Sequence, residues 1–219
     1  MSVLDPVRPK VLATRFIPQA PPDLIRSYGL DPERHLALGL ITCDQDDSLY
    51  VALDEATKQA PVEVVFGQSF WAGSAHASGP FSGECLGIVA APSPADVREG
   101  LAACVRCLEE DACFYSADRA GKLLVFPHVV ASIGRYLAAE SGLPEGSPLA
   151  YLIAPPLEAV IGLDAALKAA EVRLVKNFAP PSPTNFAGGY LTGPLEQCEA
   201  AAVAFAETIV GFAAAPRVV

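Results

Sequence analysis

The sequence repeats itself at a spacing of 110 positions, and this repeat limits what the chain can fold into. Seven residues of the first copy are found again in the second: Leu53, Asp54, Ala56, Lys58, Ala60, Val62 and Val65 recur as Leu163, Asp164, Ala166, Lys168, Ala170, Val172 and Val175. One copy is about half of the chain, which is small for a domain that must bury its own core. Each copy therefore needs its twin, or further copies, to cover its apolar surface. We predict two fused domains, residues 1–110 and 111–219.

The composition favours a globular chain that assembles. Hydrophobic residues make up 52% of the sequence, and the mean hydropathy of +0.34 is high for a soluble chain. Either an Ala-rich core accounts for this, or apolar surface is buried between subunits. The net charge of -10 argues against nucleic acid and anionic membranes as partners, because both favour stripes of Lys and Arg. Cationic or neutral small molecules suit such a surface better.

The N-terminus and the cysteines point to the cytoplasm. Asp5, Pro6 and Arg8 stand where an export signal would have its apolar run. The six cysteines are then expected as reduced thiols, and most fall in apolar runs. Cys104 and Cys107 have the spacing C-x-x-C, but the sequence offers no second pair or histidine cluster to complete a zinc site. We predict no metal site.

Each copy is predicted to alternate strands with two helices, which gives the α/β fold class. In the first copy the hydrophobic pattern predicts strand 36–43, helix 48–60, strand 62–66 and, after a long loop, strand 84–90. The second copy repeats this order with strand 149–154, helix 157–170 and strands 172–175 and 188–192. A further strand is expected near the start of each copy, within 10–17 and 122–131.

The second helix of each copy is predicted to begin at a marked N-terminus. Ser93 is the expected cap, Pro94 fixes φ at the first helical position, and the Asp96 carboxylate faces the free N–H groups. The second copy repeats this arrangement with Gly193, Pro194 and Glu196. An apolar stripe follows each start, so both helices are expected to lie against a sheet.

Several segments resemble bacterial microcompartment shell domains. Residues 160–172 (VIGLDAALKAAEV) and 53–60 (LDEATKQA) resemble the family's hallmark helix. Together with residues 154–159, 181–186 and 45–47, they make the chain similar to the tandem-domain shell proteins of the ethanolamine-utilisation type from about Arg8 to its end.

The resemblance implies an architecture and a place of action. It implies two circularly permuted shell domains per chain, each a small, mainly antiparallel sheet with flanking helices. It also implies a homotrimer shaped like a hexamer that tiles, with other shell proteins, into the shell of a cytoplasmic microcompartment enclosing enzymes. Relatives have a gated central pore and smaller subunit channels; no cofactor is required, and ethanolamine and cobalamin are implied as possible ligands. Lys58 and Lys168 match the family's lysine at tile edges.

The loop 67–80 matches the family's gating loop. It is free of charge and rich in Gly and Ser, a composition that favours turns. In this interpretation Gly67 and Gly73 are hinges, and Phe70 and Trp71 are plugs. The alternative is a core aromatic pair with a flexible connection. His76 is the loop's one histidine; it either stays free or binds a metal, and the sequence shows no partner for it.

A carboxylate cluster at residues 44–47 has two interpretations. Asp46 can simply support a helix N-terminus. Alternatively Asp46 and Glu84, with Phe114 nearby by analogy to relatives, attract an alkylammonium ion in a subunit channel. Enzyme signatures such as a phosphate loop or a nucleophile elbow are missing, so we expect no enzyme. The remaining alternatives are a ligand-sensing module of similar fold and acid/base chemistry by Asp46 and Glu84.

Overall fold

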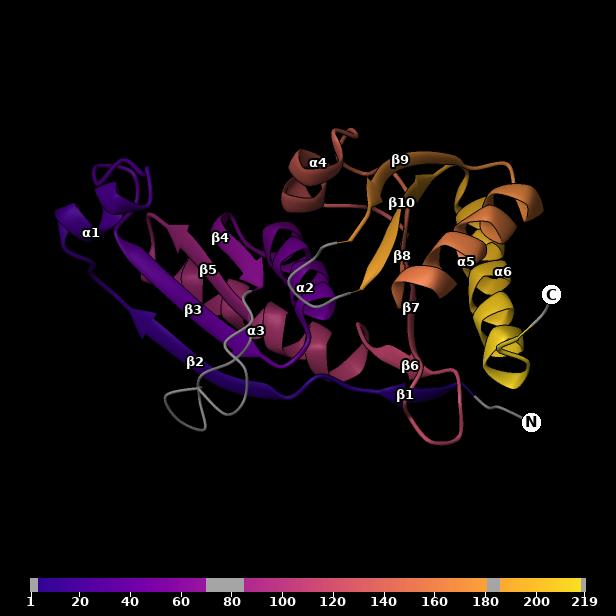
Figure 1. Cartoon of the computed structure of the whole chain (residues 1–219). Helices are drawn as coiled ribbons and strands as arrows, with labels where there is room; N and C mark the ends of the chain where they lie inside the picture. Colours follow the sequence, from indigo (N-terminus) through magenta and orange to yellow (C-terminus); the bar gives the residue numbers. More distant parts are fainter. Residues whose placement is uncertain (1–3, 70–84, 181–185, 218–219) are drawn as a thin grey trace. The chain divides into compact units, whose positions relative to one another are not determined.

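The computed structural model describes residues 4–69, 85–180 and 186–217, which form two compact units (Figure 1). The first-copy unit comprises Pro9–Ala112 and Gly134–Glu140; the second-copy unit comprises Met1–Arg8, Cys113–Ile133 and Ser141–Val219. Each unit thus contains a short segment from the other half of the sequence. The predicted division of the sequence into domains at residue 110 stays a prediction.

The first-copy unit is built on a four-stranded antiparallel sheet in the order β2-β3-β5-β4. Its strands are β2 (Val11–Ile17), β3 (Ala37–Cys43), β4 (Glu63–Ser69) and β5 (Cys85–Ala91). The long helices α2 (Asp46–Gln59) and α3 (Pro94–Glu110) pack side by side and against the sheet. The unit also contains the short helices α1 (Pro22–Ser27) and, through residues 134–140, α4 (Arg135–Ser141).

The second-copy unit repeats this topology and adds two short strands. Its six-stranded antiparallel sheet has the order β1-β6-β7-β8-β10-β9. The strands are β1 (Asp5–Val7), β6 (Phe114–Ser116), β7 (Leu124–Val130), β8 (Leu149–Ala154), β9 (Arg173–Phe178) and β10 (Ala187–Thr192). Helices α5 (Pro156–Ala169) and α6 (Leu195–Ala214) pack on each other and on the sheet. Because β7-β8-β10-β9 matches β2-β3-β5-β4, the repeat in the sequence is a repeat of structure.

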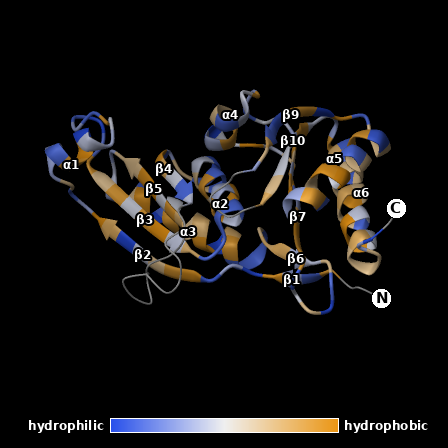
Figure 2. Cartoon of the chain, in the orientation of Figure 1, coloured by the Kyte–Doolittle hydropathy of each residue, from blue (hydrophilic) through white to orange (hydrophobic). Residues whose placement is uncertain are grey.

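Buried apolar side chains form a core in each unit, and alanine is the commonest residue in that of the second-copy unit. Figure 2 shows hydrophobic residues, in orange, along the strands and helices of both units. Every residue of β8 is buried, in agreement with its unbroken apolar run. One face of β8 meets α5 and α6 through Ala150, Leu152 and Ala154. Because side chains alternate across a strand, Tyr151 lies on the other face, where it joins a row of aromatic rings.

The predicted strands and helices lie where the structure has them, with differences at their ends. Strands β4 and β9 run on to Ser69 and Phe178, beyond the predicted ends at 66 and 175. The Ser93 cap is confirmed, since its hydroxyl accepts a hydrogen bond from the Ala95 N–H at 3.1 Å. The matching start in the second copy was wrong by one residue. Pro194 is the N-cap of α6, because its ψ of 148° is extended and helical geometry begins at Leu195.

Helix α6 is long and apolar enough, by length and composition alone, to cross a membrane. Its buried stripe, however, belongs to the core of the second-copy unit, through Cys198, Ala201, Phe205 and Ile209. This accounts for its apolar character as that of a core helix.

Candidate functional site

The most elaborate polar contact of the first-copy unit joins α2 to the beginning of α4. Asp54, only 1% exposed, accepts hydrogen bonds from the backbone N–H groups of Gly134 at 2.7 Å and Leu137 at 2.8 Å. Each carboxylate oxygen therefore binds one of the N–H groups that a helix leaves unpaired in its first turn. A residue far away in sequence thus performs the capping of α4.

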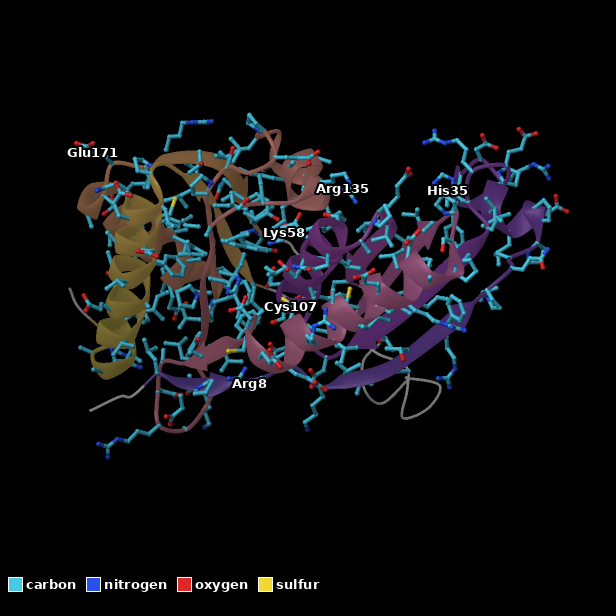
Figure 3. All side chains as sticks on the ribbon, turned by 180° about the vertical axis from the view of Figure 1, so that it is seen from behind. Arg8, His35, Lys58, Cys107, Arg135 and Glu171 are labelled. Carbon is cyan, nitrogen blue, oxygen red and sulfur yellow. The ribbon has the colours of Figure 1, made fainter. Side chains whose placement is uncertain are left out.

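Two further side chains complete this contact. The Thr57 hydroxyl accepts a hydrogen bond from the Arg135 N–H at 3.0 Å and donates one to the Asp54 carbonyl at 2.7 Å. The Arg135 guanidinium reaches past the end of α2 and donates to the carbonyls of Ala60 and Val62 at 3.1 and 3.0 Å. Figure 3 shows Arg135 on α4 and Lys58 on α2. We call the surface formed by Tyr50, Asp54, Thr57, Ala60 and Val62 the α4 seat.

The close approach of α4 depends on glycine. A Cβ on Gly134 would lie 2.5 Å from the Thr57 hydroxyl and 2.9 Å from the Asp54 carbonyl oxygen. On Gly67 in β4, a Cβ would lie 2.6 Å from the Tyr136 hydroxyl. The Tyr136 ring also approaches Tyr50, with centroids 6.5 Å apart. Gly67 therefore makes room for Tyr136; its predicted role as a hinge of the loop stays a prediction.

Burial changes the acidity of the groups in and around the seat. Loss of water raises the pKa of Asp54, although the N–H groups of Gly134 and Leu137 oppose this shift by stabilising the carboxylate. Burial likewise raises the pKa of Tyr50 and of Tyr136. The seat is thus a desolvated polar contact whose strength depends on every donor being paired.

The predicted carboxylate pair is only partly described. Asp46 is the first residue of α2, and its Oδ1 accepts a hydrogen bond from the Asp47 N–H at 3.0 Å. This agrees with the simpler interpretation, support of a helix N-terminus. Glu84 lies outside the described residues. The pairing of Asp46 with Glu84 therefore stays a prediction.

Phe114 belongs to the second-copy unit, whereas Asp46 belongs to the first-copy unit. Phe114 is 5% exposed and packs against Phe126 and Phe186, with centroids 4.9 and 5.5 Å apart. These contacts continue through Tyr151 to Tyr190. They make Phe114 a core aromatic residue, and its contact with a ligand stays a prediction.

Of the predicted gating residues, Gly67 lies in β4, while Phe70, Trp71, Gly73 and His76 lie outside the described residues. Strand β4 ends at Ser69 and strand β5 begins at Cys85, and the two pair along their length. The loop is therefore anchored at both ends to neighbouring strands. Its role as a gate stays a prediction.

The two predicted tile-edge lysines lie at matching places in the two units. Lys58, in the last turn of α2, pairs with Glu55 at 2.5 Å. Lys168, in the last turn of α5, pairs with Asp164 at 2.7 Å and is 73% exposed. A cation near a helix C-terminus is favourable, so each lysine has a local structural role besides the predicted one in assembly.

The cysteines are buried and inert in character. All six are free thiols. Cys43 and Cys85 face each other across β3 and β5 with their sulfurs 3.6 Å apart, and this contact together with burial raises the pKa of Cys85. Burial raises the pKa of Cys104, and raises that of Cys107 to about 12. Within residues 4–69, 85–180 and 186–217, no cluster of three His, Cys, Asp or Glu side chains could hold a metal ion.

Known proteins share both the sequence and the fold. The BMC domain family matches residues 37–118. Over 212 residues the chain is 47% identical to the bacterial microcompartment shell protein EutL of Clostridium perfringens (strain 13 / Type A), covering 97% of each protein. The chain belongs to the EutL family of bacterial microcompartment shell proteins. The crystal structure of ethanolamine utilization protein EutL from Leptotrichia buccalis C-1013-b is 48% identical, covers 99% of both chains and gives a TM-score of 0.94.

Family membership confirms several expectations from the sequence. The tandem, permuted BMC fold with mainly antiparallel sheets is the EutL fold. A trimeric bacterial microcompartment shell protein, PduB, shares this fold at 20% identity, with a TM-score of 0.73 over 92% of this chain and 88% of that one. The EutL relatives are named as shell proteins and not as enzymes. The chain is accordingly a structural protein of a microcompartment shell in the bacterial cytoplasm.

The α4 seat was missed by the sequence analysis. Asp54 belongs to the repeat, but its position on a predicted helix gives no reason to place it beside residues near 134. The available signal is that Asp54 and Thr57 are three residues apart, so they lie on the same side of the predicted helix, where a buried carboxylate would need hydrogen-bond donors. The sequence could not say which segment supplies them.

Proposed function

We propose that the chain is a trimeric tile of an ethanolamine-utilisation microcompartment shell, with a gated central pore and small channels through each subunit. The observation that carries the proposal is the equivalence of the two units within a EutL-family chain. Three chains of two equivalent units supply six similar sectors, enough to close a ring by repeated head-to-tail contacts. PduB, which shares the fold, is described as trimeric.

The gate is assigned to the loop that joins β4 to β5. Its sequence carries Phe70 and Trp71 for bulk and Gly73 for flexibility, and His76 is left free in this proposal. Two neighbouring strands hold the ends of the loop, a support that lets a loop rearrange while its base stays fixed. The name of the relative from Leptotrichia buccalis makes ethanolamine the first metabolite to test.

The subunit channel is assigned to Asp46, Glu84 and Phe114. Two carboxylates and an aromatic ring suit an alkylammonium ion, through charge attraction and cation–π contact. Ethanolamine is a very small ligand, so its affinity should lie roughly between millimolar and micromolar. Cobalamin is a second ligand to test, by family resemblance. In this proposal ethanolamine and cobalamin bind as molecules that the tile transports, and the tile requires neither of them as a cofactor.

The assembly is tested with the purified full chain. Light scattering at micromolar concentration should give about three times the 22.8 kDa of one chain, and negative-stain microscopy should show sheets or tubes. A stable monomer across that range would refute the tile. Tight, saturable ligand binding without sheets would favour a ligand-sensing module instead.

The channel is tested by calorimetry with ethanolamine hydrochloride. Glu84→Gln should weaken binding at least about tenfold while the trimer persists, because the shape is kept and the charge is removed. Glu33→Gln, a change at an exposed residue, serves as the matched control. Equal binding by wild type and Glu84→Gln would remove Glu84 from the site.

A further inference from the structure

A buried imidazole lies at one end of the four-stranded sheet, on His35, two residues before β3 begins. The His35 side chain is 6% exposed, and its Nε2 lies 3.3 Å from Oε2 of Glu63, the first residue of β4. Strand β5 runs between β3 and β4, with Ala91 paired to Ala37 and Ala90 paired to Glu63. The contact between His35 and Glu63 therefore spans the end of β5 and joins β4 to the segment before β3.

The hydrogen-bond partners of His35 determine how many protons the contact needs. The Nδ1 atom lies 3.1 Å from the carbonyl oxygen of Asp31, which can only accept, so Nδ1 carries a proton and donates it. The Nε2 atom faces a carboxylate, which also accepts when it is ionised. The contact with Glu63 therefore requires one further proton between Nε2 and Oε2, because otherwise two lone pairs would face each other. This proton, taken up from water, holds the pair together.

Glu63 has a second cation within reach. Its side chain is 53% exposed and lines a hollow of about 220 Å³ together with Arg135 of α4, so the carboxylate has room to turn. Figure 3 shows His35 and Arg135 on the same unit. The Arg135 guanidinium uses Nη2 alone for the carbonyls of Ala60 and Val62. In the part of the chain that the structure describes, its Nη1 and Nε groups have no hydrogen bond and remain available as donors.

We propose that Glu63 is a proton-operated switch between His35 and Arg135. With the proton bound, the carboxylate pairs with the charged imidazole of His35, and this is the arrangement in the structure. When the proton leaves for water, the neutral ring no longer attracts the carboxylate, which turns within the hollow to Arg135 and ties β4 to α4 instead. Histidine is the side chain that changes its charge between about pH 5 and 8, so the switch works around neutral pH. It lies within the first-copy unit and does not depend on the proposed ring.

The proton decides between the two partners because the partners are not equally in need of a counter-ion. A buried imidazolium without a paired charge is costly, and Glu63 is the carboxylate that His35 meets. The Arg135 guanidinium is always charged, but two backbone carbonyls already stabilise it. The carboxylate therefore stays with His35 while the ring is charged, and it is free for Arg135 once the ring is neutral. Neither state leaves Glu63 without a cation, so little free energy separates them.

Other ionisable groups around the hollow leave the switch to these three side chains. Burial, and after it the charges of Glu140 and Asp54, raise the pKa of Tyr136, which therefore stays neutral across this range. The Asp54 carboxylate is already bound by two backbone N–H groups of α4 and the residue before it. Beside the imidazole, the Asp31 carboxylate accepts a backbone N–H of its own turn at 2.9 Å. The charge that changes near neutral pH is thus that of the imidazole.

Nitrogen NMR of the imidazole rings tests the proton directly in the full chain. The chain has three histidines, and the His35 signals are assigned by their loss in His35→Gln. We expect both ring nitrogens to be protonated at about pH 5.5, and the neutral ring at about pH 8.5 to keep its proton on Nδ1, which donates to the Asp31 carbonyl. A neutral ring with its proton on Nε2, or a ring in one state over the whole range, would overturn the proposal.

Double-mutant cycles test the exchange of partners. In urea denaturation, Glu63→Gln and His35→Gln should be coupled about two- to fivefold in the equilibrium constant for folding at about pH 5.5, and uncoupled at about pH 8.5. Glu63→Gln and Arg135→Gln should show the reverse. Each cycle cancels what a single variant does alone, including the loss of the two carbonyl contacts of Arg135. The matched control is Glu145→Gln, at an exposed position of the second-copy unit, which should be uncoupled from both partners at either pH.

The two cycles must change in opposite directions with pH. Equal coupling of Glu63 to His35 at both pH values would overturn the switch, and so would loss of that coupling without a gain of coupling to Arg135. If Arg135→Gln does not fold, hydrogen exchange of the Arg135 side-chain N–H groups replaces the second cycle. At about pH 8.5 these groups should exchange more slowly in wild type than in Glu63→Gln, because the carboxylate then binds them. Equal exchange rates in the two proteins at that pH would overturn the switch.

Discussion

The Asp54 carboxylate receives the backbone N–H of Gly134, 80 residues further along the chain, at 2.7 Å. This hydrogen bond fixes a segment of the second half of the sequence within the first-copy unit. A capping interaction that is usually local therefore acts here between distant parts of the sequence. It gives the repeated aspartate a role that helix periodicity alone could not indicate.

Replacing Asp54 should destabilise the fold. We expect Asp54→Asn to lower the free energy of unfolding by about 2–3 kcal/mol, because the amide nitrogen cannot accept a hydrogen bond and leaves a buried N–H of Gly134 or Leu137 unpaired. Urea denaturation followed by circular dichroism measures this change. Glu199→Gln, at an exposed position of α6, should change the stability by less than about 0.5 kcal/mol. Equal effects of the two variants would show that the α4 contact contributes no net stability.

The stability should also depend on pH through Asp54. Burial raises its pKa above the ordinary value of 3.8, so the folded state holds the proton more tightly than the unfolded state. The contribution of Asp54 to the free energy of unfolding is fully present below its ordinary pKa of 3.8. This contribution is lost as the pH rises through the higher pKa that Asp54 has in the folded state. The difference in unfolding free energy between wild type and Asp54→Asn should therefore shrink as pH is raised from about 4 towards 8. A difference that grows over this range would mean that the two N–H donors outweigh burial.

Two glycine substitutions should have opposite effects. In Gly134→Ala the new methyl group would meet Thr57, Lys58 and the Asp54 backbone at 2.5–2.9 Å, which should cost about 1–3 kcal/mol of stability. A Cβ on Gly211, inside α6, would meet no atom within 4 Å. Gly211→Ala should therefore stabilise the chain by about 0.5–1 kcal/mol through helix propensity. Thermal unfolding of both variants measures these changes in stability. If Gly134→Ala leaves the stability unchanged, α4 shifts readily on the α4 seat.

The long elements of both copies could be predicted, because their apolar periodicity is strong. Strand β3 is recognisable as a continuous apolar run and helix α2 by apolar residues at helical spacing. The second copy repeats both patterns in β8 and α5. The repeat in the sequence also predicts that the two units share one topology. The family's motifs lie on these same elements, so the identification and the fold agree.

The short elements could not be predicted. Strand β1 has three residues, and it joins the second-copy sheet through β6. Helix α4 has seven residues, and it reaches the first-copy unit through hydrogen bonds with Asp54 and Thr57. Elements this short carry little periodicity, and their places are set by tertiary contacts between distant residues. For the same reason, the contact of Tyr136 with Gly67 could not be predicted.

The cysteines should react slowly in the native protein. Thiolate is the nucleophile, and burial raises the pKa of Cys104 and brings that of Cys107 to about 12. The contact with the Cys43 sulfur, together with burial, raises the pKa of Cys85. Titration with a thiol reagent at pH 8 should label less than about one thiol per chain within minutes, and all six once the protein is unfolded in urea. Rapid native labelling of two or more thiols would show that the helices and strands holding them open readily.

The last prediction concerns the edges of the tile. Lys58 and Lys168 lie in the last turns of matching helices and pair within them with Glu55 and Asp164. The Lys168 side chain is 73% exposed and that of Lys58 is 28% exposed, and neither belongs to an apolar core cluster. Surface pairs of this kind contribute at most about 1 kcal/mol each, and the fold should survive their loss. We expect Lys58→Ala/Lys168→Ala to keep the mass of the assembled ring in light scattering and to lose sheets in negative-stain images. Lys122→Ala, at an exposed turn, is the control and should keep both. If sheets persist in the double variant, these lysines do not mediate the contact between tiles. If the ring itself is lost, they act in the contact between the chains of one ring.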